Sequence, residues 1–196
     1  RALTQNIAMT GPAQEFGEPV LRLKDPDGII VKLVGLDMPA EAPLDDPTAP
    51  TRIRGVTILT ENAETVAGFL HRFGYAEQRR DGPFIRMASD SDVVDIRGSA
   101  GFVTGGQGTG VFDHVAFRAP DVEAVRAMRL ALRDHDGATA VHDRKYFMSL
   151  YVREPGGTLI EFASDGPGFT ADEPVPPLPG PGQRADRADD APHPAQ

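Results

Sequence analysis

Hydrophobic and polar residues alternate along two stretches of the chain that repeat one another. The first stretch is "LRLKDPDGIIVKLV" at residues 21–34, and the second is "LYVREPGGTLIEFA" at residues 150–163. Each alternates as a strand does, is interrupted by an acid-Pro-x-Gly turn, and then alternates again. Proline fixes φ in such a turn, and glycine permits a positive φ. The pattern predicts a β-hairpin that is used at least twice.

A longer repeat includes the second hairpin. The β-rich stretch at 53–60 corresponds to the one at 112–119, and each precedes a segment with apolar residues at helical spacing. Helices are expected over about 61–74 and 120–137, each ending at a glycine, with Asp121 in position to cap the second. Their apolar positions are Val66, Phe69, Leu70 and Phe73 in the first helix, and Val122, Val125, Met128 and Leu132 in the second.

Further strand patterns follow each helix. They cover residues 75–80, 83–89 and 92–98 in the first unit, and residues 139–147, 148–154 and 158–164 in the second. The repeated unit is therefore β-α-β-β-β. It predicts an α+β fold in which each helix packs one face on a sheet.

The repeats also divide the chain into segments. In chain order we expect the end of an incomplete module at 1–35, a Pro- and Asp-rich linker at 36–51, a complete module at 52–98, a Gly-rich connection at 99–110, a second complete module at 111–169 and a disordered Pro-rich tail at 170–196. Because Arg1 opens the chain inside a module, residues upstream are expected to be missing.

The composition limits which metal ligands and which binding partners the protein can have. With 196 residues and 40% hydrophobic residues the chain can bury a core, and a formal net charge of -9 argues against a nucleic-acid or anionic-membrane surface. There is no cysteine, so a metal has to be held by His, Asp or Glu. No stretch approaches the roughly 20 apolar residues that cross a bilayer, which favours a cytoplasmic protein whose partner is a small molecule or another protein.

Glu161 is an unexpected residue, because it lies in the middle of the apolar strand "TLIEFA". An unpaired carboxylate buried in such a strand costs several kcal/mol, so a partner is expected. His114 lies in the first strand of the same unit, and if the first and last strands line one concave sheet, the two side chains can converge. A His and a carboxylate are two parts of the two-His-one-carboxylate arrangement that holds non-haem Fe(II).

The other copies act as an internal control for this pair. Glu161 aligns with Lys32 in the incomplete copy and with Asp95 in the middle copy, while His114 aligns with Gly55. A residue that the fold alone requires should recur in every copy. The pair occurs only in the last unit, which favours a functional role over a structural one.

The alternatives are an ordinary structural histidine and a solvent-facing glutamate. Arg144 and Tyr151 lie just upstream of Glu161 and can line the same face. Arg144 can instead pair on the surface with Asp143 or Glu154. The nearby His142 is either a supporting residue behind the metal ligands or an exposed side chain.

These segments resemble the vicinal oxygen chelate superfamily, and specifically its hydroquinone-type extradiol dioxygenases. The resemblance covers about residues 15–174. Its segments are "FGEPVLRLKDPDGIIVKLV", "IRGVTILTENAETVAGFL", "FDHVAFRAPD" and the most specific one, "DRKYFMSLYVREPGGTLIEFASDGPGFTADEP". The resemblance implies tandem βαβββ modules that form cupped mixed sheets with the helices packed outside.

The resemblance also implies a site. Members of this group hold one Fe(II) with four modules, and the ligands by position are His114, Glu161 and a His on the first strand of the first module. Arg144 and Tyr151 match positions that line the substrate pocket. Asp113 stands where relatives often carry a His, so the supporting or acid-base role of that position is open.

The first module and half of the second are absent from this chain, so three readings remain. The chain is a fragment, which we favour, or a neighbouring chain supplies the third ligand in a homo-oligomer, or iron is not held productively. The implied activity is O2-dependent cleavage of a small hydroquinone- or catechol-like ring. The rival functions are a glyoxalase or epimerase using Mn, Zn or Ni, and a non-catalytic small-molecule-binding protein.

Overall fold

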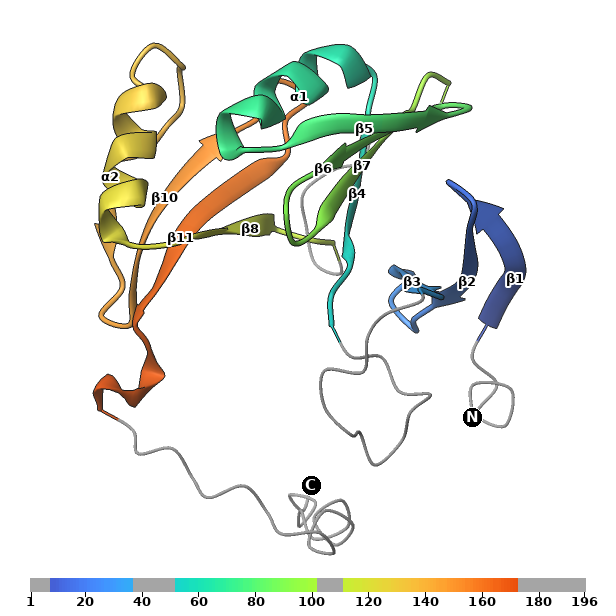
Figure 1. Ribbon diagram of the computed structural model, residues 1–196, viewed down its shortest axis with the longest axis horizontal. Coiled ribbons are helices and arrows are strands. Elements are labelled where there is room, and N and C mark those ends of the chain that lie inside the picture. Colours follow the sequence, from blue (N-terminus) through green and yellow to red (C-terminus); the bar gives the residue numbers. More distant parts are fainter. Residues whose placement is uncertain (1–7, 37–51, 102–110, 173–196) are drawn as a thin grey trace, which may run out of the picture.

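The computed structural model describes residues 8–36, 52–101 and 111–172 of the chain. These residues form three sheets and two α-helices, and each helix lies against a four-stranded sheet (Figure 1). The predicted α+β class and its repeated βαβββ order are confirmed. None of the described helices is long and apolar enough to cross a membrane.

The first sheet is small and antiparallel. It consists of β1 (Ala8–Glu15), β2 (Glu18–Lys24) and β3 (Ile30–Val34), in that order. Between β2 and β3 the Asp25 side chain accepts a hydrogen bond from the Ile29 amide at 2.7 Å, and Gly28 has a φ of 95°. The acid and the glycine of the predicted turn thus have the roles that a hairpin requires.

The middle module contains the second sheet. Its elements are β4 (Gly55–Thr60), α1 (Ala63–Leu70), the short 3₁₀ helix η2 (His71–Phe73), β5 (Ala76–Asp81), β6 (Phe84–Ala88) and β7 (Val93–Gly98). The strand order is β4-β7-β6-β5, with β4 and β7 parallel and the other neighbours antiparallel. Gly74 ends the helical segment in the left-handed conformation, as predicted.

The last module repeats this arrangement. Its elements are β8 (His114–Ala119), α2 (Val122–Ala131), β9 (His142–Asp143), β10 (Phe147–Arg153), β11 (Leu159–Pro167) and the short 3₁₀ helix η3 (Phe169–Ala171). The strand order is β8-β11-β10-β9, and β8 runs parallel to β11. The Asp121 side chain accepts a hydrogen bond from the Ala124 amide at 2.8 Å, so the predicted cap of α2 is confirmed.

One apolar core joins the two complete modules on the helix side of their sheets. Phe73 of η2 contacts Phe117 of β8 and Phe162 of β11 with ring centroids 5.5 and 5.6 Å apart. Val66 of α1 and Val125 of α2 are completely buried in the same cluster. Burial of one such side chain contributes about 1.5–3 kcal/mol, so this layer fixes the last sheet against the middle module.

The structure corrects three details of the expected elements. The helix expected over 120–137 ends at Ala131, because turns follow in which Arg133 and His135 donate to carbonyls only three residues earlier. The strand expected over 139–147 is reduced to β9, because residues 144–146 form a loop. Within the tail expected from Thr170, the residues through Asp172 are placed beside that loop.

Several expected segments lie largely outside the described residues. They are the first seven residues, most of the linker at 36–51, most of the connection at 99–110, and the tail from residue 173 onward.

Charged side chains join the small sheet to the middle sheet. Arg86 of β6 is buried and makes a bidentate ion pair with Asp95 of β7, at 2.7 and 2.9 Å. Arg86 also donates to Glu18 of β2 at 2.7 Å, and Arg54 donates to Glu18 at 3.2 Å. Burial alone would raise the pKa of Glu18, but hydrogen bonds and charge from Arg86 and Arg54 outweigh it and lower that pKa below its ordinary value.

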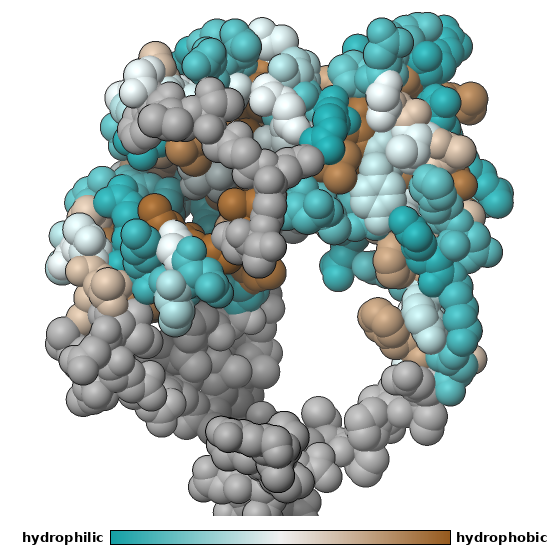
Figure 2. Space-filling view, turned by 180° about the vertical axis from the view of Figure 1, so that it is seen from behind, coloured by the Kyte–Doolittle hydropathy of each residue, from teal (hydrophilic) through white to brown (hydrophobic). Residues whose placement is uncertain are grey.

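Strand β3 of the small sheet carries exposed apolar side chains. Ile30, Val31 and Leu33 of β3 are 61%, 45% and 36% exposed. The space-filling view from behind shows apolar surface between polar side chains over this part of the molecule (Figure 2). In the complete modules α1 and α2 cover one face of each sheet with their apolar side chains.

Candidate metal centre

The parallel pairing of β8 with β11 brings His114 and Glu161 together. His114 is opposite Leu159, and Glu161 is opposite Ala116, so both side chains project from the same face of adjacent strands. His114 Nε2 lies 3.0 Å from Glu161 Oε2. The Glu161 side chain is 8% exposed and that of His114 is 33% exposed, so the pair lies at the floor of an accessible face.

Two further side chains fix this pair. Tyr151 is opposite Glu161 across the antiparallel β10–β11 pairing, and its hydroxyl donates to Glu161 Oε1 at 2.7 Å. Asp113 Oδ2 lies 2.8 Å from His114 Nδ1. A carboxylate that accepts a hydrogen bond from one ring nitrogen of a histidine orients the ring and leaves the other nitrogen for a metal. Asp113 can therefore support His114 although relatives often carry a His at its position.

Arg144 and His142 both lie near the Tyr151 ring. The Arg144 guanidinium carbon is 5.7 Å from the ring centroid, which is within the range of a cation–π contact. The rings of His142 and Tyr151 have centroids 6.2 Å apart. Within the described residues Arg144 makes no ion pair with Asp143 or Glu154. Glu154 instead accepts from the amides of its own turn. All six predicted residues thus gather around Tyr151 and Glu161.

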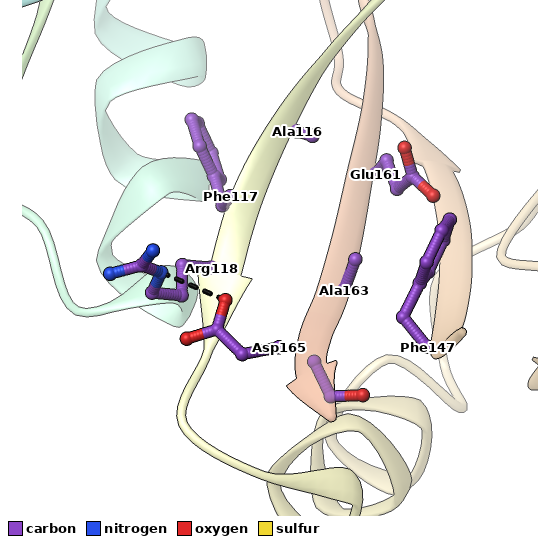
Figure 3. Close-up of a pocket in the computed structure, with 8 residues that line it drawn as sticks. Ala116, Phe117, Arg118, Phe147, Glu161, Ala163 and Asp165 are labelled. Carbon is purple, nitrogen blue, oxygen red and sulfur yellow. Dashed lines mark ion pairs between the residues drawn. The ribbon is translucent and has the colours of Figure 1, made fainter. Parts of the chain in front are cut away.

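A pocket of about 260 Å³ opens beside Glu161. Figure 3 shows the Glu161 carboxylate and the Phe147 ring side by side, and Phe117 on the other side of the sheet toward a helix. Ala116 and Ala163 lie between them on the strands, where their small side chains leave room. At the far end Arg118 and Asp165 form an exposed ion pair at 3.0 Å.

Phe147 and the two alanines were not predicted as site residues. The signal for the alanines was available, because Ala116 and Ala163 each follow a predicted ligand by two positions on a strand. Phe147 shares the alternation of Tyr151, but a bulge between Phe147 and Ser149 shifts the pairing locally. Ser149 is fully buried on the same strand, and its hydroxyl has no hydrogen-bond partner among the described residues.

The two donor atoms fit adjacent positions on a metal ion. Two ligands at right angles and about 2.1 Å from a metal lie about 3 Å from each other, and the His114 and Glu161 donor atoms are 3.0 Å apart. No group of three or more His, Asp or Glu side chains that could hold a metal occurs within the described residues. Within the described residues, His114 and Glu161 are thus two possible donors without a third.

In the other two sheets, different side chains occupy the positions equivalent to Tyr151, Glu161 and His114. The middle module pairs Arg86 with Asp95 where the last module pairs Tyr151 with Glu161, and the small sheet pairs Arg22 with Lys32. At Gly55, the equivalent of His114, an added Cβ would lie 2.0 Å from the Val93 carbonyl oxygen. The middle module therefore has no room for a histidine at that position.

Comparison with known proteins identifies sequence relatives. The chain matches no protein-family model. It is 32% identical over 171 residues to the Bacillus subtilis (strain 168) protein MhqO, named provisionally as a ring-cleaving dioxygenase, covering 82% of this chain and 54% of that protein. It is 31% identical over 184 residues to the chlorohydroquinone/hydroquinone 1,2-dioxygenase of Sphingobium indicum, covering 85% of this chain and 57% of that enzyme. The chain thus spans about half the length of the curated relatives it matches.

Solved structures show the same relationship. A Bacillus subtilis protein named provisionally as a dioxygenase superposes with a TM-score of 0.77 at 30% identity, over 88% of this chain and 58% of that one. A glyoxylase/bleomycin resistance protein/dioxygenase domain from Frankia sp. EAN1pec has a TM-score of 0.52 at 13% identity, which shows the fold alone, over 62% of this chain and 97% of that one. By its repeated βαβββ modules, its strand order and these relatives, the chain belongs to the vicinal oxygen chelate superfamily.

Proposed function

We propose that the protein containing this chain is an Fe(II)-dependent ring-cleaving dioxygenase of the extradiol type that acts on hydroquinones or catechol-like aromatics. The observation that carries the proposal is the approach of His114 Nε2 to Glu161 Oε2, at 3.0 Å, on the face that opens into the pocket. The names of the sequence relatives agree with it. Mn or Zn at the same donors is the alternative metal.

An iron ion held by His114, Glu161 and a third ligand would supply the redox and Lewis-acid chemistry that cleavage of a ring by O2 requires. The third ligand is proposed to come from a segment or a neighbouring chain outside the described residues. In this proposal the accessible face around His114 is the place where that ligand enters, because the His114 side chain is 33% exposed.

Tyr151 and Arg144 give the site its polarity. The Tyr151 hydroxyl donates to Glu161 Oε1 and so holds the carboxylate in one orientation, leaving Oε2 toward His114. The Arg144 guanidinium over the Tyr151 ring places a positive charge near the phenol that holds Glu161. A deprotonated substrate hydroxyl would be stabilised by that charge.

The pocket suits a single aromatic ring. A volume of about 260 Å³ is at the small end for ligand sites, and the Phe147 ring forms an apolar wall beside Glu161. Ala116 and Ala163 have small side chains in the lining of the pocket, so a flat ring can approach Glu161.

The test is turnover by the whole protein that carries this chain, loaded with Fe(II) under argon. We expect O2 uptake after addition of hydroquinone or methylhydroquinone, together with a ring-opened product by mass spectrometry. Glu161→Ala should abolish turnover, whereas Asp134→Ala, at an exposed acid paired with Arg133, should leave it unchanged. Turnover that needs no O2 would favour a glyoxalase-type reaction, and ligand binding unaffected by Glu161→Ala would favour a non-catalytic binding protein.

A further inference from the structure

Lys145 adopts a backbone conformation that lysine seldom takes. Its φ is 69°, in the left-handed region, within the loop of residues 144–146 that joins β9 to β10. Such a backbone conformation is strained and persists only where its surroundings hold it. The loop is thus held in place by contacts rather than by its own preference.

Those contacts come from the residues that follow β11. The Gly168 amide donates to the Tyr146 carbonyl at 2.7 Å, and the rings of Tyr146 and Phe169 stack with centroids 4.9 Å apart. The Asp172 carboxylate accepts from the Tyr146 hydroxyl at 3.2 Å and forms an ion pair with Lys145. We call residues 168–172 the clasp.

The loop itself leads directly to the candidate site. The Arg144 amide donates to the Phe147 carbonyl at 2.9 Å, and the Lys145 amide donates to Asp143 Oδ1 at 2.8 Å, so the turn is closed on both sides. Arg144 precedes the strained residue and extends over the Tyr151 ring, whose hydroxyl holds Glu161. Any movement of the loop moves Arg144 relative to the Tyr151 ring.

We propose that Asp172 is a positioning residue, which acts through the clasp to hold the 144–146 loop in the conformation that places Arg144 over Tyr151. This role rests on the proposed function in so far as Arg144 binds the substrate. The Lys145–Asp172 ion pair is solvent-exposed and weak alone. Together the contacts of the clasp hold the loop in one conformation. An arginine that contacts substrate binds it better when its position is fixed in advance.

The first measurement does not depend on activity. Amide hydrogen exchange of the chain, followed by mass spectrometry, should show exchange in residues 143–147 about fivefold faster in Asp172→Ala than in wild type. Asp172→Asn keeps an acceptor for Tyr146 but removes the charge opposite Lys145, and should lie between the two. Asp134→Ala is the matched control, an exposed aspartate paired with Arg133 away from the loop, and should exchange as wild type does. Unchanged exchange in Asp172→Ala would overturn the proposal.

The second measurement is a double-mutant cycle in the Fe(II)-loaded whole protein. Asp172→Ala should raise KM for hydroquinone about three- to tenfold with kcat changed less than about twofold, and should add nothing further in an Arg144→Ala background. Additive effects would mean that Asp172 does not act through Arg144. If the wild-type protein neither binds hydroquinone under argon nor turns it over, the proposed function fails, and hydrogen exchange alone then decides whether Asp172 holds the loop.

Discussion

At Glu161 each carboxylate oxygen has its own neighbour. Oε1 accepts from the Tyr151 hydroxyl at 2.7 Å, and Oε2 lies 3.0 Å from His114 Nε2. The other ring nitrogen of His114, Nδ1, contacts Asp113. A buried carboxylate without such partners would destabilise the strand by several kcal/mol. The polar groups that make this position tolerable in an apolar strand are the same groups that orient the proposed metal donors.

Replacement of Tyr151 tests this arrangement directly. Tyr151→Phe removes the donor to Glu161 Oε1 while keeping the ring that Arg144 and His142 contact. We expect the Kd for Fe(II) to rise about tenfold, because a carboxylate ligand that loses its hydrogen bond is less well oriented. Competition with a chelator under argon measures the change.

Tyr75→Phe is the matched control, since the Tyr75 hydroxyl donates to Asp92 in the middle module. It should lower stability and leave Fe(II) binding unchanged. Equal Kd values for wild type and Tyr151→Phe would show that the hydrogen bond to Glu161 does not support metal binding.

The paired donors could be predicted from the sequence because the chain contains its own comparison. Only the last of the repeats carries His114 and Glu161 together, and strand alternation places them on one face. Phe147 and Asp172 could not be predicted in the same way. Phe147 lies beside a bulge that changes the register, and Asp172 reaches Lys145 across 27 positions of sequence, so its role depends on tertiary contacts.

At the scale of the element, α2 holds the last sheet from its outer side. It packs on β10 and β11, and its Val125 is fully buried. Asp121→Ala removes the side-chain acceptor for the Ala124 amide, so we expect a loss of about 1 kcal/mol in the free energy of unfolding. Urea unfolding measures the loss, and Asp121→Asn should restore most of it. A loss equally large in Asp121→Asn would show that the charge near the helix start matters more than the cap.

The elements themselves follow closely from local pattern. Each predicted strand with alternating or continuous apolar residues is present, and Gly74 ends its helix where expected. The exceptions are segments in which distant contacts decide. The segment 139–147 reads as a strand, but only His142 and Asp143 pair with β10 in a ladder, because the clasp holds residues 144–146 in a loop.

At the scale of the whole molecule, Glu18 makes stability depend on pH. Its pKa in the folded protein is lowered below its ordinary value of 4.5; burial opposes this shift, and the hydrogen bonds and charges of Arg86 and Arg54 outweigh it. A lowered folded pKa stabilises the fold above pH 4.5, and this contribution is lost as the pH falls from about 4.5 through the folded value. Glu18→Gln should therefore flatten the fall of the unfolding free energy below pH 4.5.

Urea titrations between pH 3 and 6 measure this profile. Glu123→Gln, which removes an exposed carboxylate paired with Arg126 on α2, serves as the control and should retain the wild-type slope. A profile for Glu18→Gln as steep as that of the wild type would show that other carboxylates govern the acid sensitivity of the interface.

The Arg86–Asp95 pair distinguishes the middle module from the last module in its need for a bound metal. Arg86 and Asp95 stand where Tyr151 and Glu161 stand in the last module, so the middle module has a positive side chain in the region that corresponds to the proposed metal site. A cation that is covalently part of the chain is neither supplied by the solution nor removed by a chelator. If the proposed function holds, removal of iron should therefore change the metal site of the last module and leave the Arg86–Asp95 pair of the middle module intact.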